Sequence, residues 1–281
     1  MGEIAFGYLS ERGNRANEDF VYAEDSFGVL LDGASGMGGA NHFSETNLTE
    51  AQWFSNAFGT RVSALLSEGV SVPDALARAS ASVLHDFENA CDIEQLDVFE
   101  MPSATISIVT VDDDAVDVWW LGDSPIAVLT DRGIDCLLDT RIGELDALAL
   151  DEATKRRAAR GTSDCVGSDL VSDILRKNRS LMNTDGGYFI LEPRGEGLAR
   201  ISHRSYERGS VRAILAGSDG LFAAFDVYGI VSLPEMLEDV SLAALRGVIN
   251  RMRVVEEADP ALERYPRLKQ GDDASAFFFV L

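Results

Sequence analysis

The chain has few cysteines and few histidines for its 281 residues, three of each. The cysteines, Cys91, Cys136 and Cys165, are odd in number, widely spaced and contain no CxxC pair. This pattern predicts free, reduced thiols and argues against a disulfide framework or a zinc knuckle. A cysteine nucleophile is disfavoured as well, because so few histidines are available to activate one.

Basic residues and long apolar runs are also scarce. The 24 Lys and Arg residues are outnumbered by 47 Asp and Glu, which gives a formal net charge of −23. Such a charge opposes binding to nucleic acid or to an anionic membrane surface. No apolar run approaches the ~20 residues of a membrane span, and Met-Gly-Glu-Ile-Ala is unlike a secretory signal. We therefore expect a soluble, cytoplasmic protein whose partners are neither nucleic acids nor membranes.

Hydrophobic residues, in contrast, make up 46% of the chain and suffice for a substantial core. Short apolar or alternating runs predict many antiparallel strands. Helical spacing of apolar residues, with Ser71 as a cap, predicts two consecutive helices between residues 54 and 87, and a long helix is expected at 234–252. The strands are expected at 4–9, 20–23, 27–31, 104–111, 115–121, 126–129, 199–203, 211–216 and 275–281. The acidic triplet 112–114 fits a solvated hairpin turn. Residues 1–281 are therefore expected to form a single α+β domain.

Residues 141–186 differ from the rest. The stretch 146–160 is amphipathic and ends in a Lys-Arg-Arg cluster suited to a helix C-terminus, whereas 161–183 is polar and weakly periodic. We expect an irregular insertion that lies over one edge of the core, and segments of this kind are often functional lids.

Four short acidic motifs follow apolar, strand-like runs: Asp19, Asp32-Gly33, Asp219-Gly220 and Asp272-Asp273. Taken singly each is weak, because Asp-Gly is a common turn dipeptide. A fold that brought the four strand ends together, however, would gather oxygen ligands for hard divalent cations. Two such cations form a centre suited to phosphoryl transfer.

In this order and with these spacings, the motifs resemble those of the PP2C (PPM) family of metal-dependent serine/threonine phosphatases. The resemblance covers almost the whole chain. It rests on Arg15-Ala16-Asn17-Glu18-Asp19, on Leu30-Leu31-Asp32-Gly33 followed by Met37-Gly38-Gly39, on Ser103-Ala104-Thr105 with Gly122-Asp123-Ser124, on Ser218-Asp219-Gly220-Leu221, and on Asp272-Asp273-Ala274-Ser275.

The resemblance implies a β-sandwich of two antiparallel sheets flanked by helices, in α-β-β-α layers, with the metals at one end. It implies two Mn²⁺ or Mg²⁺ ions and a third, looser one. By position, Asp32 would bridge the two ions, the Gly33 carbonyl would bind one of them, and Asp219 and Asp272 would be terminal ligands. Asp19 would hold metal-bound waters, and Asp123 would serve the third ion. Arg15 would bind the substrate phosphate. Glu18 and Asp273 are weaker candidates.

Three departures from the family pattern matter. The spacing from Arg15 to Asp19 is one residue short, so Arg12 is an alternative phosphate ligand. Ala34 stands where eukaryotic members carry a histidine resembling a general acid; His42 is the nearest substitute, although an ordinary surface histidine is the simpler interpretation. Pro125 stands where the family carries an arginine. We expect this change to remove a structural ion pair and to leave catalysis intact.

The leading hypothesis is a bacterial-type protein phosphatase that hydrolyses phosphoserine and phosphothreonine in substrates of a Ser/Thr kinase. The alternative is a PP2C-like domain with little or no catalysis that acts as a sensor or protein-binding module, as the altered arginine spacing and missing histidine suggest. A two-metal nuclease or phosphodiesterase is disfavoured, because the negative charge repels a polyanion.

Overall fold

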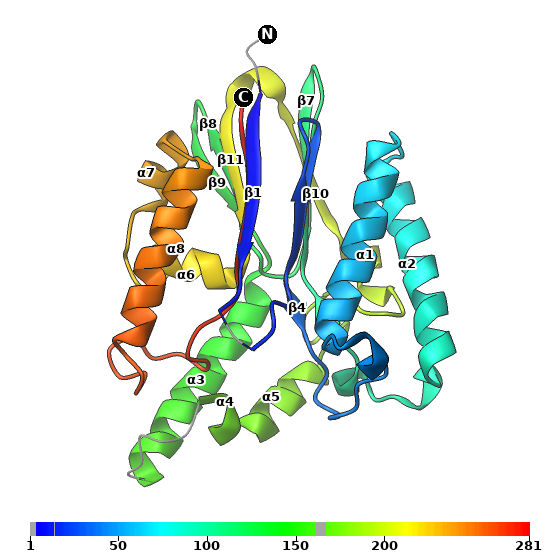
Figure 1. Ribbon diagram of the computed structural model, residues 1–281, viewed down its shortest axis with the longest axis vertical. Coiled ribbons are helices and arrows are strands. Elements are labelled where there is room, and N and C mark those ends of the chain that lie inside the picture. The colour runs from blue at the N-terminus through cyan, green and yellow to red at the C-terminus, as the bar shows by residue number, and fades with distance from the viewer. Residues whose placement is uncertain (1–3, 14, 161–166) are drawn as a thin grey trace.

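Two five-stranded antiparallel sheets stack face to face in the computed structural model, which describes residues 4–13, 15–160 and 167–281 (Figure 1). The first sheet has the order β1 (Ala5–Glu11), β12 (Ala274–Val280), β11 (Val211–Gly217), β8 (Ile126–Thr130), β9 (Gly133–Leu137). The second has the order β10 (Ser202–Glu207), β7 (Ala115–Leu121), β6 (Ile106–Val111), β3 (Phe27–Leu31), β2 (Phe20–Ala23). A short pair, β4 (Gly33–Ala34) and β5 (Ser103–Ala104), continues from the second sheet.

The period of two along the strands distributes apolar side chains to both faces of each sheet. In β12, Phe277 and Phe279 pack between the sheets, whereas Phe278 belongs to the cluster under the neighbouring helices. In β3, Leu30 faces the other sheet while Val29 packs toward the opposite helical layer. Both strands are thus buried on two sides, as the continuous apolar run at 27–31 predicts.

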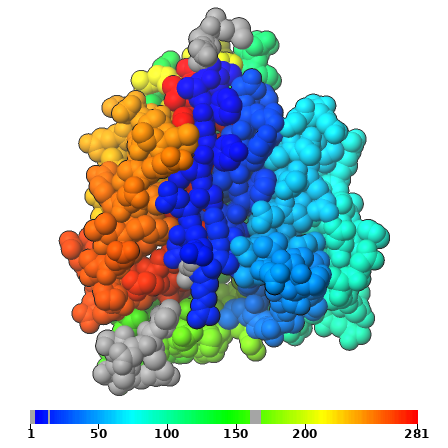
Figure 2. Space-filling view, viewed as in Figure 1, coloured from blue at the N-terminus to red at the C-terminus, as the bar shows by residue number. Residues whose placement is uncertain are grey.

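Helices cover the outer face of each sheet. The second sheet is covered by α1 (Glu50–Ser67) and α2 (Val72–Ala90), and the first by α6 (Asp219–Asp226), α7 (Leu233–Glu238) and α8 (Leu242–Glu257). Figure 2 shows β1 running between α8 and the α1–α2 pair. Thr49 opens α1 with a capping box to Gln52, and Ser71 caps α2 as expected. The predicted α-β-β-α layers are confirmed.

Some element boundaries differ from the prediction. The single helix expected at 234–252 is wrong: Ser241 accepts a hydrogen bond from the Ala244 N–H and starts a new helix, so α7 and α8 are separate. The strand expected at 199–203 begins instead at Ser202, after a 3₁₀ turn at Glu196–Arg200. Strand β9 and helix α6 were not predicted, because both are short and contain glycine.

The insertion at 141–186 is largely helical, so the expectation of an irregular segment is wrong. It contains α3 (Thr140–Arg160), α4 (Gly167–Leu170) and α5 (Ser172–Arg179), which lie at one end of the sandwich (Figure 1). The helix predicted at 146–160 is present and starts six residues earlier, at Thr140.

Some sequence-based predictions fall outside the described residues. These are the ones that concern residues 1–3 and residues 161–166, which include Cys165. Cys91 and Cys136 carry free thiols. No helix in the described part of the chain combines the length and the hydropathy that a membrane span requires.

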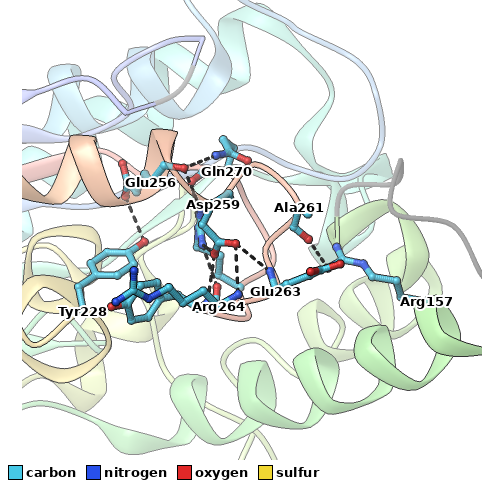
Figure 3. Close-up of polar contacts among 10 residues, drawn as sticks. Arg157, Tyr228, Glu256, Asp259, Ala261, Glu263, Arg264 and Gln270 are labelled. Carbon is cyan, nitrogen blue, oxygen red and sulfur yellow. Dashed lines mark hydrogen bonds and ion pairs between the residues drawn. The ribbon is translucent and has the colours of Figure 1, made fainter.

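The loop between α8 and β12 (residues 258–273) is organised around Asp259 (Figure 3). Its Oδ1 accepts the N–H groups of Glu263 and Arg264, and its Oδ2 accepts the Tyr265 N–H and the Arg267 guanidinium at 2.8 Å. Arg267 also donates to backbone carbonyls on both sides of the loop. The hydrogen bonds of Asp259 and Arg267 therefore hold the loop in one conformation, and Leu262, Tyr265 and Leu268 add apolar contacts.

The Asp259 carboxyl group is ionised in this arrangement. Burial by itself would raise its pKa, but the Arg267 guanidinium and the backbone N–H groups of the loop outweigh that effect and lower the pKa to about 2. A carboxylate with a depressed folded-state pKa stabilises the protein above its unfolded-state pKa, and the stabilisation is lost as the pH falls toward the folded-state value.

We expect Asp259→Asn to lower the free energy of unfolding by about 2 kcal/mol at pH 7, because charge-assisted hydrogen bonds are lost. The difference from wild type should shrink as the pH falls from about 4 to 2, measured by denaturant unfolding. Asp151→Asn is a matched control: Asp151 forms an exposed pair with Lys155 on α3, so its loss should cost less than about 0.5 kcal/mol. A pH-independent deficit in Asp259→Asn would contradict the charge assignment.

Candidate metal centre

Strand register brings the predicted acidic residues to one end of the sandwich. Phe20 pairs with Leu31, so Asp19 and Asp32 lie next to each other at the ends of β2 and β3. The pairing of Thr105 with Asp32 continues the second sheet past β3: the Thr105 N–H donates to the Asp32 carbonyl and the Asp32 N–H to the Thr105 hydroxyl.

The first sheet contributes the remaining acidic residues in the same way. Gly217 pairs with Ala276, which places Asp219 near Asp272. Ala216 pairs with Ile126 on its other side, which places Asp219 near Asp123. The two sheets meet where the Asp219 N–H lies 3.4 Å from Asp32 Oδ2.

Two glycines of the motifs permit this convergence. A Cβ on Gly33 would collide with the carbonyl of Glu18, and one on Gly220 would collide with the carbonyl of Asp273. Both collisions are with backbone atoms, which cannot move aside as a flexible side chain can. The glycine after each aspartate thus serves close packing between two motifs.

The gathered carboxyl groups disfavour one another's ionisation. Burial, followed by Asp219, Asp19 and Asp272, raises the pKa of Asp32 well above its usual range. Burial also raises the pKa of Asp19 to about 8, against an opposing hydrogen bond from Ser275. The pKa of Asp219 is raised by desolvation and then by Asp272, although one side of this residue remains exposed.

Asp123 belongs to the same cluster. Desolvation, with Asp219 and Asp146 adding to it, raises the pKa of Asp123. Asp146, on α3, has its pKa raised to about 6 by burial and then by Asp219. No sequence pattern marks Asp146, because it is an isolated aspartate in an amphipathic helix.

The acidic groups match the requirements of a hard divalent cation. Asp19 Oδ2 is buried and accepts no hydrogen bond from the described residues. An orphaned carboxylate oxygen beside further carboxylates suits Mg²⁺ or Mn²⁺, which prefer oxygen ligands. The side chains are neighbours, but they do not surround a common ion position. Within the described ranges, no group of three or more His, Cys, Asp or Glu residues is arranged to hold an ion.

A lysine partly neutralises the cluster. Lys269 Nζ lies 2.8 Å from Asp272 Oδ2 and 3.1 Å from Oδ1. Burial alone would lower the pKa of Lys269, but Asp272, Asp219 and Asp32 together raise it. Sequence reasoning missed Lys269, although a cation three residues before an acidic motif is a usable signal.

Three lower-ranked candidates have structural partners. Asp273 Oδ1 accepts the Gly13 N–H at 2.9 Å and its Oδ2 accepts the Glu18 N–H at 2.8 Å, so it fixes the loop before β2. Glu18 Oε1 accepts the hydroxyls of Ser35 and Thr49. His42 Nδ1 lies 2.6 Å from Glu50 Oε1, which also accepts the backbone N–H of His42 at 2.9 Å.

The predicted phosphate ligands lie at the start of the same loop. Arg15 is exposed, and its carbonyl accepts a hydrogen bond of 3.4 Å from Arg12 Nη1. The two arginines are therefore adjacent, and both stay candidate ligands for the substrate phosphate.

A further arginine joins the insertion to the centre. Arg179, the last residue of α5, donates to the Ala34 carbonyl at 2.7 Å and to the Ser103 hydroxyl at 3.0 Å. Both acceptors belong to the β4–β5 pair that contains Gly33. Arg176 reaches the Met37 carbonyl of the glycine-rich segment. The insertion is thus anchored beside the predicted ligands, which its weak periodicity did not indicate.

Comparisons with known proteins agree with this architecture. The serine/threonine phosphatase PstP/Ppp of Mycobacterium tuberculosis superposes with a TM-score of 0.57 at 16% identity, covering 99% of this chain and 98% of that one. Stp1 of Staphylococcus aureus gives 0.55 at 12% identity, over 100% and 96%. A PstP catalytic domain in complex with two manganese ions gives 0.56 at 15% identity, over 99% and 97%.

A search among curated proteins gives no match. The solved structures share the fold at low identity. The family model for protein phosphatase 2C, in contrast, matches the sequence itself, over residues 7–253, which is most of the chain. The chain therefore belongs to the protein phosphatase 2C family.

Proposed function

We propose that the protein is a metal-dependent phosphatase that hydrolyses phosphoserine and phosphothreonine in protein substrates. The observation that carries the proposal is the convergence of Asp19, Asp32, Asp123, Asp219 and Asp272 from both sheets at one end of the sandwich. A Ser/Thr kinase that acts on the same proteins would produce the phosphorylated substrate. The three structural relatives, each described as a serine/threonine phosphatase, support the reaction class.

Each residue has a defined task in this proposal. Asp32, Asp219, Asp272 and the Gly33 carbonyl would hold two Mn²⁺ or Mg²⁺ ions, and Asp123 a third. When bound, the ions would activate a water molecule for attack on phosphorus and offset the charge of the phosphate. Asp19 Oδ2, buried without a described partner, would accept a hydrogen bond from water in the site. Arg15 would bind two phosphate oxygens with its planar guanidinium.

The second candidate is a PP2C-like module that binds a partner without catalysis. The observation that favours it is Lys269, whose ammonium group occupies the position next to Asp272. Turnover of p-nitrophenyl phosphate or of a phosphothreonine peptide, with and without Mn²⁺, separates the two. Mn²⁺-dependent hydrolysis supports the phosphatase, whereas folded protein without such turnover supports the module.

Asp32→Asn and Asp219→Asn should each reduce Mn²⁺-dependent hydrolysis to the background rate, because each would remove a carboxylate that is proposed to hold the metal ions. In metal-free protein, Asp32→Asn should raise the free energy of unfolding by about 1 kcal/mol, because repulsion among the clustered carboxylates is relieved. Steady-state kinetics and metal-free denaturation measure the two effects. Near-normal rates in either variant would show that the ligand assignment is wrong.

Lys269→Met should strengthen Mn²⁺ binding about tenfold, a change of about 1.4 kcal/mol, because a competing cation is removed. The same change should destabilise the metal-free protein. Isothermal titration and thermal unfolding in chelator measure these effects. Lys155→Met is the matched control, since Lys155 also pairs with an aspartate in its own segment but lies outside the cluster. Equal effects of both substitutions would argue against competition at the site.

Arg15→Ala should raise KM about tenfold with a smaller effect on kcat, because a charged hydrogen bond to the phosphate is lost. Arg12→Ala is the paired variant. A raised KM only in Arg12→Ala would transfer the role to Arg12, and an unchanged KM in both would exclude the two arginines.

A further inference from the structure

A cavity of ≈ 710 Å³ opens beside the predicted metal ligands. It lies between α3, α6 and the loop that follows α8, and Asp123, Asp219 and Asp272 form part of its wall. Figure 3 shows Tyr228 and Glu256, which also line it, held together by a hydrogen bond from the tyrosine hydroxyl. A substrate whose phosphate reaches the aspartates would therefore place its neighbouring residues in or over this cavity.

Much of the wall is apolar. Leu150 on α3 faces the cavity together with Phe222 on α6 and Val227 at the end of that helix. Val227 is 47% exposed, so its side chain is accessible to an occupant of the cavity. The volume falls within the range of about 300–1,000 Å³ typical of ligand sites and would admit a few side chains of an extended segment.

The charge of the wall is negative. Its two cations are engaged: Lys269 pairs with Asp272, and Arg267 pairs with Asp259. Glu144, Asp146 and Asp226 also line the cavity, and none of them forms an ion pair with a basic side chain in the described part of the chain. Carboxylates without ion pairs repel acidic occupants and favour cationic ones.

We propose that this cavity binds the residues flanking the phosphorylated side chain of the substrate, and that it selects segments in which a basic residue adjoins an apolar one. The inference rests on the proposed function for the position of the phosphate. The apolar residue would contact Leu150, Phe222 and Val227, and the basic residue would pair with Glu144 or Asp226 at the exposed rim.

The test uses two phosphothreonine peptides that differ only in an Arg-Leu or a Glu-Ser flank. Fluorescence anisotropy of labelled peptides in chelator measures binding without turnover, and kcat/KM with Mn²⁺ measures selection during turnover. We expect about tenfold preference for the Arg-Leu peptide, because its arginine gains an exposed ion pair and its leucine an apolar contact, whereas the carboxylates of the wall repel the Glu-Ser flank. Equal affinity for the two peptides would overturn the proposal.

Two variants locate the preference. The double reversal Glu144→Lys with Asp226→Lys should remove it, and Ala147→Trp, which fills the cavity from α3, should weaken binding of the Arg-Leu peptide about tenfold. The controls are Glu238→Lys on α7 and Ala158→Trp on α3, both exposed and away from the cavity, which should retain the preference. A preference that survives both cavity variants would overturn the proposal.

Turnover of p-nitrophenyl phosphate separates this inference from the proposed function, because that substrate has no flanking residues. Absence of Mn²⁺-dependent turnover, with selective binding of the Arg-Leu peptide, would reject catalysis and support the cavity as a peptide site. Mn²⁺-dependent turnover of p-nitrophenyl phosphate without peptide selection would support catalysis and reject the cavity.

Discussion

Repulsion among clustered carboxylates at one end of the sandwich is the constraint on which this structure depends. The strand register places Asp19, Asp32 and Asp219 close enough to repel one another. Desolvation and this mutual repulsion raise their pKa values. Such a cluster opposes folding unless positive charge compensates it. Lys269 supplies part of that compensation, and divalent ions would supply more. The clustering of carboxylates therefore lowers the stability of the fold and also makes the site suitable for binding cations.

Hydrogen-bonded loops hold the cluster in place. Asp273 receives two backbone N–H groups from the segment before β2 and thereby connects the last acidic motif to the first. Asp259 organises the loop that carries Lys269 to Asp272. Arg179 connects the inserted helices to the strand pair at Gly33. These contacts between polar groups fix the backbone at the end of the sandwich where the acidic residues lie.

The sequence predicted the features that repeat or that carry strong local signals. The period of two revealed most strands, Ser71 marked the start of α2, and the Asp-Gly motifs marked the strand ends that converge. It did not reveal the break at Ser241, because the apolar spacing continues through α7 and α8. It also did not reveal Asp146, Arg179 or Lys269. Arg179 contacts Ser103, 76 residues away in the chain, Asp146 acts on Asp219 from another element, and Lys269 lies in a loop without periodicity, so no local pattern records these interactions.

The convergence of distant aspartates into a cation site is the central claim, and a crystal structure of the protein soaked with Mn²⁺ tests it most directly. The anomalous difference map should show manganese peaks between Asp32, Asp219 and Asp272, with the Lys269 ammonium displaced from Asp272. A well-ordered structure with no peak among these three aspartates at saturating Mn²⁺ would contradict the account.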